Sequence, residues 1–251
     1  MSVEDERFAS ERAQNIAGMG ADNALKSFSR TWQVEAARYN YIYNFSWLGR
    51  PIIQLPQDVF AMQELIWTIQ PDLIIETGIA HGGSLIFSAS MLELNAACGG
   101  PENGEVLGID IDIRAHNREA IEAHPMFKRI TMIQGSSIAP EVIEEVRARA
   151  VAKHRVLVCL DSNHTHDHVL AELKAYAPLV SVGSYCVVFD TAIEEVPAAM
   201  SANRRWGRGN NPMTAVREFL KTTDRFEIDQ HIPSKLLITV ASHGYLKCVK
   251  E

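Results

Sequence analysis

The sequence has few cysteines, and none of them is spaced as in a metal or redox motif. Only four of the 251 residues are cysteine, and no two of them form a CxxC pair. A zinc ribbon or a thioredoxin-type redox site is therefore not indicated. Cys159 and Cys186 lie inside apolar runs typical of buried strands, so we expect free core thiols and a reducing, cytoplasmic environment.

The chain also lacks the charge and hydropathy patterns of nucleic-acid-binding and membrane proteins. Its formal net charge is −7, with 24 Lys and Arg against 31 Asp and Glu. A broad cationic surface for nucleic acid is therefore not expected. No stretch approaches the ~20 apolar residues that cross a bilayer, so we expect no transmembrane segment. The charged start, MSVEDERFASERAQ, does not resemble a secretory signal.

Several cofactor-binding motifs are missing as well. Neither GxGxxG nor GxxxxGK(S/T) occurs, which counts against binding of a pyrophosphate or triphosphate. Non-haem iron oxygenases need HxD or HxE, but none of the nine histidines has an Asp or Glu two residues later. An oxygenase is therefore disfavoured, and a nicotinamide-dependent oxidoreductase remains only as an alternative.

From about residue 72, short apolar runs alternate with amphipathic stretches. Runs rich in Val, Ile and Leu without strict alternation predict strands buried on both faces of a parallel sheet. They cover residues 72–80, 105–112, 129–137, 155–162 and 184–191. Helices are expected at 83–97, 114–124, 140–152, 166–180 and 212–222. Residues 226–232 and 235–249 are expected to pair as antiparallel strands with no helix between them. This order predicts an α/β sandwich with right-handed crossovers.

The first part of the chain has a helical pattern, interrupted by an aromatic stretch. Helices are expected at about 4–28, 31–44 and 57–70, and RYNYIYNFSWLGRPIIQLPQD separates the last two. We expect residues 1–56 to form a helical segment that serves oligomer contacts or covers the active site. Residues 57–251 would form the main domain.

Polar residues gather where the predicted strands end, and ligands bind at that edge of an open parallel sheet. In the first loop, ETGIAHGGS, glycines allow close approach of the backbone to a ligand, and Glu76 could face a cationic group. Asp110 could accept both ribose hydroxyls, with Asp112 as its rival. A ribose and a positive charge without bridging phosphates suggest S-adenosylmethionine (SAM), whose adenine could bind Gln134 or the serines after it. The candidate cofactor-binding residues are Glu76, Gly78, His81, Gly82, Ser84, Asp110, Ser136, Ser137 and Asp161.

The segment LDSNHTHDHV, residues 160–169, combines carboxylates with three histidines. It is one residue too short for the HxHxDH pattern of binuclear zinc hydrolases. Asp161 and Asp190 end neighbouring predicted strands about 4.8 Å apart, so their carboxylates could share one hard cation such as Mg²⁺. His164 lies in the loop nearby and could act as a base. Thr165 is expected to cap a helix that carries His166 and His168 as solvated or capping residues.

A long polar segment, EVPAAMSANRRWGRGNN, follows the fifth predicted strand. Its length and its three arginines around Trp206 favour a lid or substrate loop.

These segments, in this order, resemble the cephalosporin hydroxylase and rhamnosyl O-methyltransferase family of class I SAM-dependent enzymes. The similar segments are residues 43–67, 76–92, 108–114, 134–137, 160–173, 187–191, 209–212 and 236–247. The resemblance implies a Rossmann-like methyltransferase fold, a three-layer sandwich whose mostly parallel seven-stranded sheet has an antiparallel C-terminal strand. It also implies a divalent cation, commonly Mg²⁺, bound by Asp161 and Asp190, with Thr191 or water as a further ligand. His164 corresponds to the proton acceptor, and a homo-oligomer is expected.

The resulting functional prediction is a SAM- and metal-dependent O-methyltransferase. Its acceptor would be a hydroxyl of a sugar or a glycosylated metabolite, and a vicinal diol would chelate the cation. The alternatives are a nicotinamide-dependent oxidoreductase and a non-catalytic binding subunit of a biosynthetic pathway.

Overall fold

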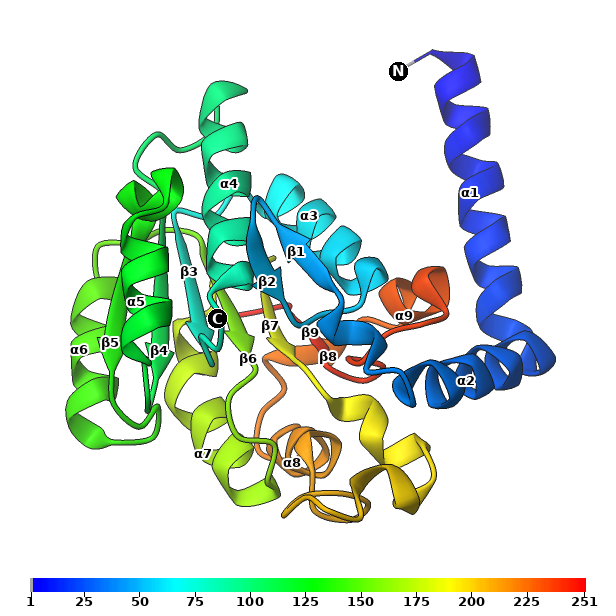
Figure 1. Ribbon diagram of the computed structural model, residues 1–251. Coiled ribbons are helices and arrows are strands. Elements are labelled where there is room, and N and C mark those ends of the chain that lie inside the picture. The colour runs from blue at the N-terminus through cyan, green and yellow to red at the C-terminus, as the bar shows by residue number, and fades with distance from the viewer. Residues whose placement is uncertain (1) are drawn as a thin grey trace.

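The computed structural model describes residues 2–251, and a seven-stranded sheet of order β5-β4-β3-β6-β7-β9-β8 forms its centre (Figure 1). The five central strands, from β5 to β7, pair in parallel, and β9 runs antiparallel to both β7 and β8. The strands are β3 (Leu73–Thr77), β4 (Glu105–Asp110), β5 (Ile130–Gln134), β6 (Val156–Leu160), β7 (Tyr185–Val188), β8 (Phe226–Ile228) and β9 (Tyr245–Cys248). The predicted mostly parallel sheet with an antiparallel C-terminal strand is confirmed.

Helices cover both faces of the sheet, so the core is divided into two apolar clusters. Leu73 and Ile75 of β3 belong to one cluster and Ile74 to the other, because successive side chains of a strand point to opposite faces. The first cluster is closed by α6 (Pro140–Ala150), α7 (His166–Tyr176) and α8 (Pro212–Phe219). The second is closed by α3 (Pro56–Ile69), α4 (Gly83–Ala97), α5 (Ala115–Glu122) and α9 (His231–Leu236). The expected three-layer Rossmann-like sandwich is therefore confirmed.

The N-terminal helices break at a different residue from the one expected. α1 (Val3–Ala21) and α2 (Asn23–Ala37) meet at Asp22, whose side chain accepts a hydrogen bond from the N–H of Leu25 at 2.9 Å. An aspartate in this position starts a helix because it satisfies a free backbone donor. α1 extends away from the body of the molecule, and Ile16 is its single buried residue (Figure 1).

After α2 the aromatic stretch forms irregular and extended structure. The turn η1 (Tyr41–Tyr43) leads into a small hairpin of β1 (Phe45–Trp47) and β2 (Arg50–Ile52). No helix among residues 2–251 combines the length and apolar composition required to cross a bilayer.

The C-terminal prediction was partly wrong, because α9 lies between the last two strands. β8 and β9 do pair antiparallel, but residues 236–240 are not part of a strand. The buried carboxylate of Asp58 on α3 holds them instead. It accepts hydrogen bonds from the hydroxyl of Thr239, the N–H of Val240 at 2.9 Å and the hydroxyl of Tyr245 at 2.9 Å. These three bonds attach the apolar segment to α3.

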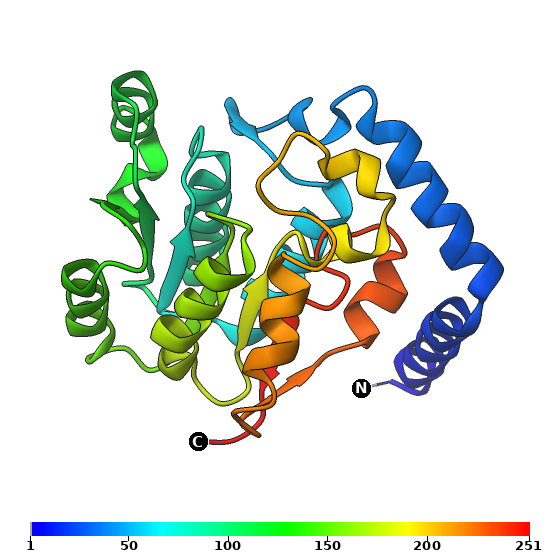
Figure 2. The same cartoon turned by 90° about the horizontal axis from the view of Figure 1, so that it is seen from below.

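The segment that follows β7 folds back over the carboxyl edge of the sheet. It contains the short turns η4 (Thr191–Glu195) and η5 (Ala198–Ser201), and it lies beside α2 in both views (Figures 1 and 2). An ion pair between Arg30 of α2 and Glu195, at 3.3 Å, joins the two elements.

Candidate active site

A cavity of about 880 Å³ opens at the carboxyl edge of the central strands. This size is within the ordinary range for small-molecule sites. Most of the residues predicted from the strand ends line it: Gly78, His81, Ser84, Asp110, Ser136, Ser137, Asp161, His164 and Asp190. Glu76 and Gly82 are not among its lining residues.

The loop after β3 begins at Gly78. Its backbone lies so close to the end of the neighbouring strand β6 that no side chain fits at this position. Gly78 has φ +91°, and a Cβ added there would lie 2.1 Å from the carbonyl oxygen of Asp161. Ala80 and Gly82 also have positive φ. The loop therefore folds tightly against the end of β6, and the glycine makes this close approach of the backbone possible.

Asp110 is attached to this loop, whereas its rival Asp112 lies outside the cavity. The Asp110 carboxylate accepts hydrogen bonds from the N–H groups of Ile79 at 2.8 Å and Ala80 at 3.3 Å. The side chain of Asp112 is 70% exposed and lies 3.8 Å from Arg114. Only Asp110 lines the cavity, so the structure favours it over Asp112 as a ligand-binding carboxylate.

Glu76 lies beneath the loop. The residue is 4% exposed, and its carboxylate accepts a hydrogen bond from Ser84, which does line the cavity. Burial raises the pKa of Glu76 to about 7. The predicted contact of Glu76 with a cationic ligand group stays a prediction, and in this structure the partner of its carboxylate is Ser84.

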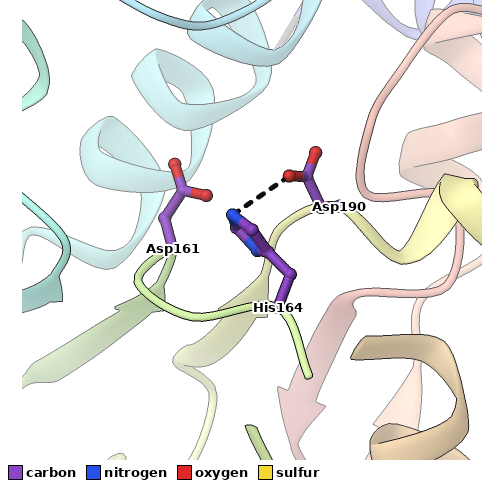
Figure 3. A group of neighbouring side chains, drawn as sticks. All are labelled: Asp161, His164 and Asp190. Carbon is purple, nitrogen blue, oxygen red and sulfur yellow. Dashed lines mark ion pairs between the residues drawn. The ribbon is translucent and has the colours of Figure 1, made fainter. Parts of the chain in front are cut away.

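Asp161, His164 and Asp190 form a compact acidic cluster in the wall of the cavity. They follow β6 and β7, and their side chains point toward one another (Figure 3). One ligand atom from each lies within 4.8 Å of the other two, and the Nε2 atom of His164 is 3.3 Å from a carboxylate oxygen of Asp190. Asp190 adopts φ +58°, a left-handed conformation that few residues other than glycine tolerate. Strained residues of this kind concentrate at functional sites.

The electrostatics of this cluster suit a bound cation. Burial, followed by the nearby charge of Asp190, raises the pKa of Asp161 well above its ordinary value. Among residues 2–251 no lysine or arginine pairs with either aspartate, and His164 is the one ion-pair partner of Asp190. Two facing carboxylates are a reasonable donor set for a hard divalent cation, and the imidazole lies beside them.

Thr191 does not take part in the cluster. It is fully buried, it does not line the cavity, and its hydroxyl accepts a hydrogen bond from the N–H of His243 at 3.2 Å. The suggestion of Thr191 as a third protein ligand is not supported by this position.

His166 and His168, in the first turn of α7, have contacts that differ from those predicted. His166 contacts α8, where its Nδ1 atom lies 2.8 Å from the hydroxyl of Thr214. His168 was expected to be solvated or capping, but it lines the cavity and lies 3.0 Å from the hydroxyl of Ser137. Thr165 is the N-cap residue, although its side chain bonds to Asn163 and does not cap the helix.

A second wall of the cavity comes from parts of the N-terminal segment and of the segment after β7, which the sequence suggested as a cover and as a lid or substrate loop. We define the cover as residues 32–55 together with residues 191–210. Trp32 and Tyr41 line the cavity from the first part, and Trp206 lines it from the second. The Trp206 ring lies 4.7 Å from the His164 ring, with the guanidinium of Arg204 4.6 Å from the indole. The density of aromatic residues in 39–47 was the available signal.

Comparisons with known proteins agree on one family. The family model described as Rhamnosyl O-methyltransferase/CmcI matches residues 39–249. A Rhamnosyl O-methyltransferase of Mycobacterium leprae is 29% identical over 210 residues, covering 82% of this chain and 85% of that protein. A Rhamnosyl O-methyltransferase of Mycobacterium tuberculosis is 28% identical over 238 residues, covering 90% of each.

Solved structures share the fold. An apo structure of CmcI superimposes with a TM-score of 0.57 at 20% identity, over 83% of this chain and 78% of that one. An O-methyltransferase from Bacillus cereus in complex with SAH superimposes with a TM-score of 0.53 at 16% identity. The match covers 91% of this chain and 92% of that one.

The family match covers most of the chain. It includes the strand-end loops, the acidic cluster, residues 39–55 of the cover and all of its second part, residues 191–210. This family assignment excludes the two alternative functions, a nicotinamide-dependent oxidoreductase and a non-catalytic binding subunit. The chain belongs to the Rhamnosyl O-methyltransferase/CmcI family and is a SAM-dependent O-methyltransferase.

Proposed function

We propose that this methyltransferase requires a divalent cation, Mg²⁺ in the first place, and acts on a hydroxyl of a sugar or glycosylated metabolite. The observation that carries this proposal is the acidic cluster of Asp161, His164 and Asp190 in the wall of the cavity. Relatives named Rhamnosyl O-methyltransferase and a CmcI structure with Mg and SAM support it.

Asp161 and Asp190 would hold the cation. Their carboxylates face each other without a cationic side chain to balance them. A cation bound there would lower the pKa of an acceptor hydroxyl and fix its direction. Two neighbouring hydroxyls of a sugar could occupy adjacent positions of such a site, which favours a vicinal diol as the acceptor.

His164 would take the proton from the acceptor hydroxyl. Its ring lies between Asp190 at 3.3 Å and Trp206 at 4.7 Å, so its orientation is held from two sides. A positioned base of this kind contributes about 10²–10⁴-fold to a rate. The acceptor oxygen would then attack the methyl group in line, and alignment would supply much of the remaining acceleration.

The cofactor would lie along the loops after β3, β4 and β5. SAM supplies the methyl group and a sulfonium charge that carboxylates attract. Asp110 would bind the ribose, and the positive-φ loop would approach the methionine portion. Glu76 would act indirectly, because its carboxylate holds the Ser84 hydroxyl. We propose that the cofactor-binding residues are Glu76, Gly78, His81, Gly82, Ser84, Asp110, Ser136, Ser137 and Asp161.

The acceptor would bind between the acidic cluster and the cover. Aromatic rings such as Trp206 pack well against the apolar faces of sugar rings, while Arg204 and Arg205 can donate hydrogen bonds to hydroxyls. Residues 1–56 would cover the site and contribute contacts in a homo-oligomer. We further propose that the enzyme works in the cytoplasm on a small-molecule or saccharide acceptor.

The test is a methyl-transfer assay with labelled SAM against sugars, nucleotide sugars and glycosylated natural products. Metal-free enzyme should be inactive with the acceptor that the screen identifies, and Mg²⁺ should restore turnover. Turnover that is insensitive to a chelator would reject the metal role, and methylation restricted to acceptors without sugars would reject the substrate class.

A further inference from the structure

The charged side chains on the two walls of the cavity have opposite signs. The wall at the strand ends carries three carboxylates, those of Asp110, Asp161 and Asp190. In the cover, all of whose residues the structure describes, the charged residues that line the cavity are Arg204 and Arg205. The chain as a whole has a net charge of −7, so two cations on one wall do not follow from its average composition.

These two arginines have no carboxylate partner within residues 2–251, because the acids of their own segment are engaged elsewhere. The carboxylate of Glu194 accepts hydrogen bonds from the N–H of Gly209 at 2.8 Å and from the side chain of Asn211. Glu195 pairs with Arg30 of α2 at 3.3 Å. Both guanidinium groups at the cavity are exposed, so water solvates them in the free protein and a ligand can reach them.

Arg204 is held near the proposed base. Its guanidinium carbon lies 4.6 Å from the centroid of the Trp206 ring, and that ring lies 4.7 Å from the ring of His164. The guanidinium and the imidazole are therefore separated by no more than the sum of these two distances, which one sugar ring with a substituent can span. The contact with the indole orients the guanidinium without neutralising its charge.

Asn210 attaches the same segment to the start of α7. Its side-chain oxygen accepts a hydrogen bond from the N–H of His166 at 2.9 Å, and its side-chain nitrogen donates to the carbonyl oxygen of Arg205 at 3.2 Å. The backbone that carries the two arginines is thus linked to the chain just after His164. The position of the cations relative to the acidic cluster is therefore set by contacts within the protein.

The chemistry of a guanidinium pair favours an anion as its ligand. A guanidinium presents its N–H donors in a planar fork that matches the oxygens of a carboxylate or a phosphate. Such charge-assisted hydrogen bonds are roughly twice as strong as neutral ones. A neutral sugar would accept hydrogen bonds from the same donors but would leave both charges unbalanced in the closed complex.

We propose that the acceptor is an anionic saccharide, whose carboxylate or phosphate group binds Arg204 and Arg205 while a ring hydroxyl lies at the acidic cluster. This inference rests on the proposed function and specifies its substrate class. The separation of charge would also orient the acceptor, because the reverse orientation would place its anionic group against the carboxylates of the other wall.

The experiment compares three acceptors that share the same neighbouring ring hydroxyls: methyl α-glucoside, its glucuronic acid analogue, and glucose 1-phosphate. With SAM and Mg²⁺, the full-length wild-type protein should methylate one of the two anionic sugars with a kcat/KM about tenfold or more above that of the neutral sugar. A higher value for the glucuronic acid would identify the anion as a carboxylate, and a higher value for glucose 1-phosphate would identify it as a phosphate. The double variant Arg204→Gln, Arg205→Gln should bring the ratio close to one.

Arg208→Gln is the matched control. Arg208 is an exposed arginine of the same segment that does not line the cavity, so this variant should keep the wild-type ratio. Calorimetry with S-adenosylhomocysteine (SAH) should give the same affinity in all of these proteins, which would show that the other wall is intact. The preference of the wild type for the anionic sugar should also weaken as the salt concentration rises.

The outcomes separate this inference from the proposed function. Equal kcat/KM values for the neutral and the anionic sugars in the wild type would overturn the inference and leave the proposed function in place. A preference that persists in the double variant would overturn it as well, because another group, such as the bound cation, would then recognise the anion. Methylation of acceptors without sugars alone would reject the proposed substrate class and this inference together.

Discussion

The two walls of the cavity are built in different ways. On the proposed cofactor side, the loops after β3, β4, β5 and β6 follow adjacent strands of one sheet, and backbone hydrogen bonds join them directly, as between the N–H of Gly78 and the carbonyl oxygen of Ile109. On the other side, the cover combines two segments separated by more than a hundred residues, and a side-chain ion pair links Glu195 of the second segment to Arg30, just before the first. We propose from this difference that the wall assigned to the cofactor is fixed and the wall assigned to the acceptor is adaptable, with the acidic cluster between them.

The largest effect is expected at the boundary between the two walls. His164→Ala should reduce methyl transfer by roughly 10²–10⁴-fold, because the acceptor would lose its positioned base. The affinity for SAH should change little, since the cofactor loops do not depend on this side chain. Single-turnover rates and calorimetry measure the two quantities. If metal affinity fell together with the rate, His164 would be a metal ligand and not the base.

Alanine substitutions at two glycines with positive φ, one in each wall, allow a direct comparison of how tightly the walls are packed. Gly49, in the hairpin of the cover, has φ +85° and no atom within 4 Å of an added Cβ, whereas a Cβ at Gly78 would lie 2.1 Å from the Asp161 carbonyl oxygen. Gly49→Ala should cost about 1 kcal/mol of folding free energy. Gly78→Ala should cost several kcal/mol and weaken SAH binding more than tenfold. Urea unfolding and calorimetry measure both, and equal losses would show that the two walls are equally tight.

The carboxylate of Asp58 supports the C-terminal segment that includes Val240, a residue of the cavity wall. Burial raises the pKa of Asp58 from 3.8 to about 6. Between these values the unfolded chain has lost the proton that the folded chain still holds. The free energy of unfolding should therefore fall by up to about 3 kcal/mol as the pH rises from 4 through 6. Asp58→Asn should remove this contribution, so parallel pH profiles for the two proteins would refute the assignment.

The smallest effect is expected at the cover. Trp206→Ala should raise the KM for the sugar acceptor about tenfold through loss of aromatic contact, and Trp206→Phe should recover part of it. The affinity for SAH should not change. Trp67→Ala on α3, which does not line this cavity, is the control. A loss of SAH affinity in Trp206→Ala would mean that the cover also holds the cofactor.

The same contrast explains how much could be predicted from the sequence. The sheet, the strand-end loops and the meeting of Asp161 with Asp190 follow from apolar runs and from strand geometry, which are local features with a simple rule. Asp110 could not be separated from Asp112, because both point the same way in a strand, and only the turn after β4 distinguishes them. His168 was misjudged because its partners, Ser137 and Glu172, come together only when α7 packs on the sheet. Trp32 likewise reaches the cavity only through the packing of distant segments, whereas the break at Asp22 has a local cause, its hydrogen bond with the N–H of Leu25.

The central claim is that Asp161 and Asp190 form one divalent-metal site beside a base, His164. Its most direct measurement is a titration of the full-length protein with Mn²⁺, followed by electron paramagnetic resonance. We expect one bound ion per chain in the wild-type protein, loss of that ion in Asp190→Asn, and retention in His164→Ala. The absence of bound Mn²⁺ in the wild type, or unchanged binding in Asp190→Asn, would contradict the account.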